Sequence, residues 1–164
     1  MDAITAMTTR RSIRQYKDEP VKPEDLEVIL NCGRLAPTGV NRQAWKFIVA
    51  TEQKVKEAVA EATDYGKFIA QAGVVIAVAI GPDAVCPNED SAAATCNMLN
   101  AAHALGYGGC WIGANGNDTA RRVGAVLGVP EDWRIMALFS VGVPQGPATR
   151  EKKTLEEVVS YNHF

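Results

Sequence analysis

The residues best suited to bind a charged ligand lie near the start of the chain, which reads RRSIRQY from Arg10 to Tyr16. Three guanidinium groups and a hydroxyl fall within five positions, at Arg10, Arg11, Ser12 and Arg14. A guanidinium offers a planar fork of donors that meets a phosphate or a carbonyl edge with two hydrogen bonds. The formal net charge of the chain is −2, so a local cluster of cations is what favours an anion site. A solvated basic surface is the alternative interpretation of this segment alone.

A second polar segment, PTGVNRQAW, runs from Pro37 to Trp45 between a predicted helix and a predicted strand. Side-chain amides both donate and accept hydrogen bonds, which suits a ligand edge of mixed polarity. Taken alone, the segment is typical of an ordinary loop with turn chemistry.

A glycine-rich segment, LGYGGCWIG, extends from Leu105 to Gly113. Its glycines resemble a dinucleotide-binding motif, but that motif follows a strand and this segment follows a predicted helix. We therefore expect a helix C-cap and then a tightly packed chain, which either serves packing or lets a flat ligand approach the backbone. A last basic run, Arg150 to Lys153, is either a surface charge run or part of an anion site.

Hydrophobic periodicity predicts helices and strands in a single domain over residues 1–164, with no repeat or linker. We predict a helix that starts near Pro23 and fades near Pro37, a helix over 52–63, a long helix capped by Asp90 and closed by Gly106, and a helix from Asn117 or Asp118 to Gly128. Strands are predicted over 45–51, 73–80 and 135–143, the second buried on both faces. An early strand, glycine loop and helix unit is missing, which favours α+β layering over a doubly wound fold.

Composition excludes several classes of protein. Hydrophobic residues make up 47% and charged residues 22%, as in a globular protein. The small net charge gives no general reason to bind nucleic acid or an anionic membrane, and the run from Val74 to Ile80 is too short to span a bilayer. The four cysteines are scattered, which argues against a zinc site or a disulfide framework. Together with an N-terminus that lacks a signal-peptide core, this predicts a cytoplasmic protein.

The four segments, in this order and spacing, resemble the FMN-dependent nitroreductase family over nearly the whole chain. RRSIRQY is similar to the family's phosphate and ribityl contact, and PTGVNRQAWKFIV to its loop of the form P-S-S-x-N-x-Q-P-W. The stretch DSAAATCNMLNAAHALGYGGCWIG is similar to its central helix and flavin-facing turn, and KKTLEEVV to its C-terminal arm. Two departures are Gly39 at the second loop serine and Ala44 at the proline before tryptophan.

The resemblance implies a role for each matching residue. Arg10 and Ser12 would hold the FMN phosphate and ribityl chain with Arg11 alongside, and Arg14 would lie near flavin N1 and the C2 carbonyl. Pro37, Thr38 and Gly39 would contact the flavin bound mainly to the other subunit, in a loop ordered by Asn41. The N–H of Gly113 would address flavin N5 with Ile112 beside the ring, and Arg150 and Lys152 would complete the phosphate site. No catalytic side chain and no metal are implied, because the chemistry resides on the flavin.

The implied fold is α+β, with a mainly antiparallel sheet between helices and a C-terminal arm exchanged within a homodimer. The implied activity is the transfer of hydride from NAD(P)H to tightly but non-covalently bound FMN, and then of two electrons to a small organic acceptor such as a nitroaromatic or a quinone, with ping-pong kinetics. Alternatives are a dehalogenase, an enone reductase, a flavin-fragmenting enzyme or a non-catalytic FMN-binding protein. Only GPDAVCPNE separates Ile80 from Asp90, where longer members insert helices over the flavin, so a more open pocket is expected. No residue pattern selects NADH over NADPH, and Cys110 is interpreted as a packing residue.

Overall fold

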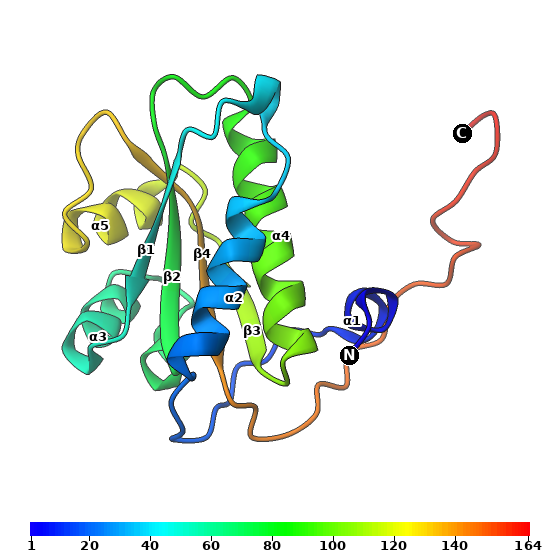
Figure 1. Ribbon diagram of the computed structural model, residues 1–164, viewed down its shortest axis with the longest axis horizontal. Helices are drawn as coiled ribbons and strands as arrows, with labels where there is room; N and C mark the ends of the chain where they lie inside the picture. Colours follow the sequence, from blue (N-terminus) through cyan, green and yellow to red (C-terminus); the bar gives the residue numbers. More distant parts are fainter.

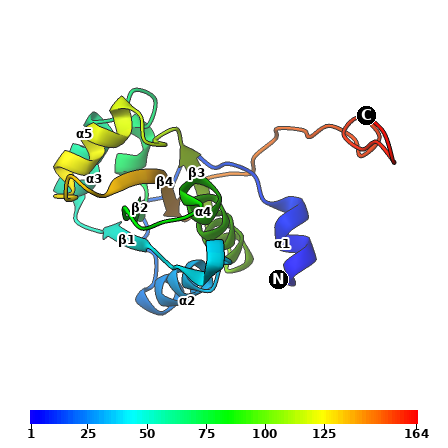
Figure 2. The same ribbon diagram turned by 90° about the horizontal axis from the view of Figure 1, so that it is seen from above.

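A four-stranded antiparallel sheet forms the centre of the computed structural model, which describes residues 1–164. The strands are β1 (Trp45–Ala50), β2 (Val74–Ile80), β3 (Gly108–Ile112) and β4 (Arg134–Gly142), in the order β1-β2-β4-β3. Helices α2 (Pro23–Arg34) and α4 (Pro87–Ala104) cover one face, and α3 (Gln53–Glu61) and α5 (Asp118–Val126) cover the other (Figures 1 and 2). The expected α+β layering around an antiparallel sheet is confirmed.

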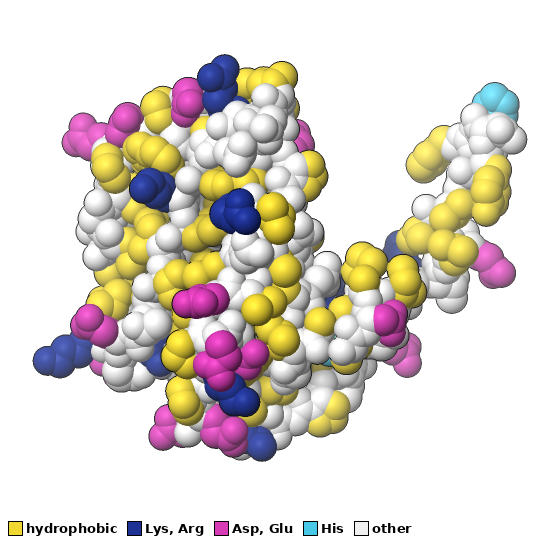
Figure 3. Space-filling view, in the orientation of Figure 1, with side chains coloured by type: hydrophobic (Ala, Val, Ile, Leu, Met, Phe, Trp, Pro, Cys, Tyr) yellow, Lys and Arg dark blue, Asp and Glu magenta, His cyan; other side chains and the backbone are white.

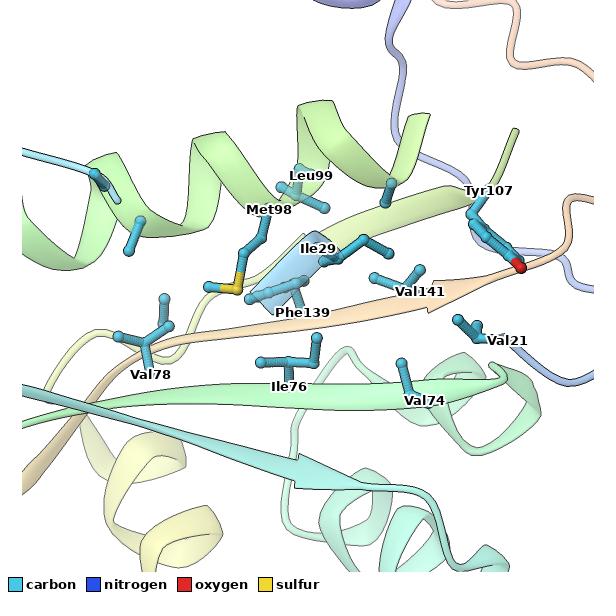
Figure 4. Close-up of a cluster of buried hydrophobic side chains, with 14 of the residues drawn as sticks. Val21, Ile29, Val74, Ile76, Val78, Met98, Leu99, Tyr107, Phe139 and Val141 are labelled. Atoms are coloured by element: carbon cyan, nitrogen blue, oxygen red, sulfur yellow. The ribbon is translucent and has the colours of Figure 1, made fainter. Parts of the chain in front are cut away.

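Strand β2 lies at the centre of the sheet, and all seven of its residues are buried. Alternate side chains point to opposite faces of a strand. Val74, Ile76 and Val78 therefore join the core beneath α2 and α4 (Figure 4), while the intervening residues join a second core beneath α3 and α5. The prediction of a strand buried on both faces is confirmed, and the reason is that helices cover both faces of the sheet.

Helices α2 and α4 pack closely against each other through small residues. A Cβ atom at Gly33 would lie 2.7 Å from Cγ of Met98, so this contact has no room for a larger residue. Ala94 and Ala102 on α4 are completely buried. The alanine-rich pattern thus marks a closely packed helix, as the sequence indicated.

The predicted start of α4 was wrong. The helix begins at Pro87, with Cys86 at the N-cap position, and Asp90 lies inside the first turn. Proline at the first helical position needs no N–H donor and has a φ angle already suited to a helix. The Asp90 side chain is buried and serves a contact to a distant loop, described below, instead of capping its own helix.

Strand β3 was not predicted, because its sequence GGCWI is short and begins with two glycines, which are rare in strands. Tertiary packing explains the glycines. A Cβ atom at Gly109 would lie 2.6 Å from the carbonyl oxygen of Ser140 on β4 and 2.7 Å from Cδ2 of Leu99 on α4. The segment that follows α4 is therefore a strand that packs tightly against both β4 and α4.

The N-terminal helix packs against the main body, whereas the C-terminal tail extends away from it. Helix α1 (Ala3–Thr9) stands beside the C-terminal end of α4, and residues after Ala148 run away from the body (Figure 1). The tail carries exposed hydrophobic side chains (Figure 3), among them Leu155, Val158 and Tyr161. Two short elements, η1 (Gly39–Asn41) and η2 (Lys67–Gln71), complete the fold. No helix is long and apolar enough to cross a membrane.

Substitution of Gly109 by alanine tests the close packing of β3. The added methyl group meets backbone atoms of β4, which cannot move aside without disturbing the sheet. We expect Gly109→Ala to lower the free energy of unfolding by about 1–3 kcal/mol, as overpacking does, measured by urea denaturation. Gly146→Ala is the matched control, because a Cβ atom there meets nothing within 4 Å. Equal stability of the two variants would contradict this account of the strand.

Candidate functional site

The arginine cluster near the N-terminus and the basic residues near the C-terminus line one pocket of about 360 Å³. The pocket lies between the segment after α1 and residues 147–152. Its charged lining residues are all cations: Arg10, Arg11, Arg14, Arg150 and Lys152. Ser12 adds a hydroxyl to the lining, and Arg11 Nε donates to the carbonyl oxygen of Arg150 at 3.1 Å. Sequence segments about 140 residues apart therefore meet in a site with the charge and donors to bind an anion.

Contacts with strands β3 and β4 hold the N-terminal segment in place. The N–H of Ile13 donates to the carbonyl of Gly109 at 3.0 Å, and Ser12 forms a parallel bridge with Gly109. The Tyr16 hydroxyl donates to the carbonyl of Ile13 at 2.7 Å and lies 2.7 Å from Oγ of Ser140. Burial raises the pKa of Tyr16, so the hydroxyl keeps its proton and remains a donor. Sequence reasoning did not find Tyr16, whose role depends on contacts with β4.

The free edge of β3 continues beyond this segment toward Gly113. The Gly109 carbonyl faces the N-terminal segment. Alternate residues of a strand direct their backbone groups to the same edge, so the backbone groups of Trp111 and Gly113 also face this free edge. The Gly113 N–H donates to no protein group, and a Cβ atom there would meet nothing within 4 Å. From Gly109 to Gly113 the strand rises about 13 Å. The free edge of β3, which carries backbone N–H donors, therefore extends from the basic pocket to the exposed Gly113. Gly113 lies next to the buried Ile112.

Burial raises the pKa of the Cys110 thiol, which is the main effect on this residue, and the nearby Arg14 and Arg10 oppose it. The side chain is 2% exposed. A buried, protonated thiol is a poor nucleophile, which is consistent with the interpretation of Cys110 as a packing residue.

The loop after α2 has an unusual backbone conformation. Val40, Asn41 and Gln43 have φ angles of 48°, 56° and 53°, in the left-handed region that residues other than glycine rarely adopt. Gln43 donates from its backbone N–H to Oγ1 of Thr38 at 3.2 Å, and from Nε2 to Oδ1 of Asn41 at 3.2 Å. Such strain persists where surrounding contacts fix the backbone, and it is common at binding sites.

The structure explains why glycine replaces the second serine of this loop. A Cβ atom at Gly39 would lie 3.0 Å from Sγ of Cys86 and 3.4 Å from Cβ of Val85. The residues that precede α4 therefore occupy the space that a serine side chain needs. Pro37, on the other side of the loop, is exposed.

Within one chain, the loop of residues 37–43 lies far from the basic pocket. Gly39 contacts Asp90 at the start of α4, whereas Thr9, next to the pocket, contacts His103 near the end of the same helix. Thirteen residues of helix separate Asp90 from His103, which corresponds to about 20 Å. The loop and helix α1 lie at opposite ends of α4 in Figure 1. Of the predicted site residues, the arginine cluster, Ser12, Arg150 and Lys152 converge, and the loop residues Pro37, Thr38, Gly39 and Asn41 lie elsewhere.

His103 is a neighbour of the basic pocket that the sequence placed in a core or an interface. Its Nε2 lies 2.9 Å from Oγ1 of Thr9, which precedes Arg10. Partial burial lowers the pKa of His103, and the positive charges of Arg10 and Arg11 lower it further. The ring therefore supports the N-terminal segment in its neutral form.

Comparisons with known proteins identify the family of the chain. Residues 7–66 and 62–143 match the Nitroreductase family. A protein of Archaeoglobus fulgidus, provisionally named NADH dehydrogenase/NAD(P)H nitroreductase, is 33% identical over 150 residues, which are 88% of this chain and 86% of that protein. The chain belongs to the Nitroreductase family, as its motifs indicated, and the expected class of enzyme, an oxidoreductase, is confirmed.

Two solved structures share the fold over their whole length. An FMN-dependent nitroreductase from Clostridium difficile has a TM-score of 0.91 and 26% sequence identity, with 98% of this chain and 99% of that chain covered. A nitroreductase, provisionally named, from Desulfovibrio desulfuricans in complex with FMN has a TM-score of 0.85 and 29% identity, with 100% of this chain and 98% of that chain covered. The prediction of a nitroreductase-like fold is confirmed.

The pH dependence of stability tests the environment of His103. Because its pKa is lowered in the folded state, the unfolded chain binds this proton more readily. The free energy of unfolding is therefore unaffected by His103 above an ordinary histidine pKa of about 6.5 and falls as the pH drops below that value. We expect His103→Gln, which can still hydrogen-bond to Thr9, to lose less stability than the unsubstituted protein between about pH 7.5 and 5.5.

Urea denaturation at the two pH values measures this difference. His163→Gln is the matched control, because His163 is exposed in the tail. The control is expected to follow the unsubstituted protein. An equal loss of stability in both variants would show that His103 titrates as an exposed histidine.

Proposed function

We propose that the protein is an FMN-dependent oxidoreductase that uses NAD(P)H as electron donor and reduces a small organic acceptor, such as a nitroaromatic or a quinone. The observation that carries the proposal is the basic pocket, where five cations from two ends of the chain surround a space without a carboxylate. Membership of the family and the FMN-binding structural relatives support the choice of ligand. FMN, when bound, would supply the redox chemistry for hydride transfer from NAD(P)H and for two-electron reduction of the acceptor, and the two substrates would occupy one site in turn.

The residues of the pocket fit the charged end of FMN. A phosphate carries up to two negative charges and accepts several hydrogen bonds, which the guanidinium groups and the Ser12 hydroxyl can donate together. Arg10, Ser12, Arg150 and Lys152 would hold the phosphate, with Arg11 fixed to the carbonyl of Arg150 alongside them. The hydrogen bond between Ile13 and Gly109 keeps this arrangement in register with the sheet.

The edge of β3 fits the other end of the cofactor. Gly113 has a backbone N–H without a protein acceptor and no side chain, so a flat ring can approach it closely. Ile112 provides a hydrophobic neighbour, and Arg14, which lines the pocket, places a positive charge near Cys110 of this strand. A fixed cation near the flavin pyrimidine favours the state that carries more negative charge, and thus promotes acceptance of electrons.

Two features support a homodimer in which each subunit, a single domain over residues 1–164, helps to complete the partner's site. The loop of Pro37, Thr38, Gly39 and Asn41 lies about 20 Å along α4 from the region of the basic pocket, and a second copy would bring its own loop to the flavin. The tail also carries hydrophobic side chains that its own chain leaves largely exposed, among them Leu155 and Tyr161. We infer that this tail wraps around the partner subunit, where burial of those side chains would stabilise the dimer.

The function is tested by anaerobic mixing of FMN-loaded protein with NADH and, separately, with NADPH, while the flavin absorbance is followed. We expect rapid bleaching by at least one donor and recovery of the colour when a quinone or a nitroaromatic is added. A yellow protein that neither donor bleaches would favour a non-catalytic FMN-binding protein. Failure to bind FMN would contradict the cofactor assignment itself.

Removal of one guanidinium tests the placement of the phosphate. We expect Arg10→Ala to weaken FMN binding by about 1.5–3 kcal/mol, the range for hydrogen bonds to charged groups, which is about 10- to 150-fold in Kd. Arg121→Ala is the matched control, because Arg121 lies on α5, away from the pocket, and is exposed. Quenching of flavin fluorescence measures both constants. Equal Kd values for the two variants would place the phosphate elsewhere.

A further inference from the structure

Asp90 is a buried carboxylate that the basic pocket and the edge of β3 do not involve. It lies in the first turn of α4 and is 2% exposed. Its Oδ1 accepts a hydrogen bond of 2.8 Å from the backbone N–H of Gly39, a contact between residues 51 positions apart. Its Oδ2 is buried and has no hydrogen-bond partner.

A buried carboxylate oxygen without a donor is costly, because water no longer hydrates it. Asparagine would offer the same acceptor to Gly39 with no charge to bury, and alanine would avoid both buried oxygens. The first turn of α4 favours a carboxylate, but the exposed Glu89 provides that interaction without the cost of burial. The one hydrogen bond of the Asp90 side chain connects it to the loop of Thr38 to Gln43. The role of Asp90 therefore concerns that loop.

The loop needs an external anchor, because it contains three left-handed residues other than glycine. Val40 is β-branched and 78% exposed, so packing of its own side chain does not hold it in this conformation. Gly39 is in contact range of the residues that precede α4, and its N–H is fixed by Asp90. The hydrogen bond to Asp90 thus joins the strained loop to the rigid start of a central helix.

We propose that Asp90 is a positioning residue: through the N–H of Gly39 it holds the loop of residues 38–43 in the left-handed conformation in which the loop meets the flavin of the partner subunit. This inference rests on the proposed function for the identity of the ligand. The anchor itself does not, because both of its partners belong to one chain. Asp90 acts from behind the loop and touches no reacting atom.

Hydrogen exchange at the Gly39 amide, followed by NMR on the full-length protein without added FMN, tests the anchor. We expect Asp90→Ala to accelerate this exchange by about 10- to 100-fold, as the loss of a hydrogen bond to a charged group allows. Asp90→Asn, which keeps a neutral oxygen acceptor, should restore part of the protection. Glu89→Gln is the matched control: it changes an exposed carboxylate in the same helical turn, and should leave the Gly39 amide unchanged.

Steady-state kinetics of the FMN-loaded protein test the consequence for the site. We expect Asp90→Asn to raise KM for a quinone acceptor several-fold while kcat changes less than twofold, because a loosened loop impairs placement of the acceptor more than the chemistry on the flavin. A purely structural role would lower Tm and leave KM of the folded enzyme unchanged. If Asp90→Ala does not fold, Asp90→Asn against Glu89→Gln decides both measurements.

Two outcomes overturn the proposal, and a third separates it from the proposed function. Exchange at Gly39 in the Asp90 variants within twofold of the Glu89→Gln control would remove the anchor. Faster exchange with an unchanged KM would make Asp90 a structural residue only. Protein that neither binds FMN nor is reduced by NAD(P)H would instead refute the proposed function, and would leave the exchange result as the test of the anchor alone.

Discussion

The close backbone contact between the N-terminal segment and β3 is the constraint on which the rest of the site depends. The Ile13 N–H donates to the Gly109 carbonyl, and a Cβ atom at Gly108 would lie 2.5 Å from Cγ1 of Ile13. Only glycine leaves room for this approach. Because the contact fixes the chain between Ser12 and Tyr16, it also fixes the direction of the arginine side chains on either side of Ile13, and hence the position of the basic pocket.

That constraint explains how a chain with a net charge of −2 forms a strongly cationic site. Five positive side chains from two segments are held around one pocket, and their mutual repulsion is unfavourable until an anion is bound. Hydrogen bonds to the sheet offset this repulsion, because those of Ile13 and Tyr16 hold the segment in place whether or not a ligand is present. The pocket is thus organised before binding, which reduces the entropy that binding must overcome.

Helix α4 divides the functional residues between its two ends. Its C-terminal end supports the N-terminal segment through His103 and Thr9, and its N-terminal end supports the strained loop through Asp90 and Gly39. A single rigid helix therefore sets the separation of the two regions. In a homodimer, the same helix would define how far the loop of one subunit must reach toward the pocket of the other.

The sequence by itself determined the layered α+β fold, the buried strand β2 and the arginine cluster of Arg10 to Arg14, because hydrophobic periodicity and clustered guanidinium groups are local properties. It gave the wrong start for α4 and missed β3, since Asp90 and the glycines of β3 make their decisive contacts with Gly39, Ser140 and Leu99, residues distant in sequence. Only the tertiary structure decided that Arg150 meets Arg11 and that the loop of Gly39 lies at the far end of α4. Those relations depend on how strands and helices pack, which no local pattern encodes.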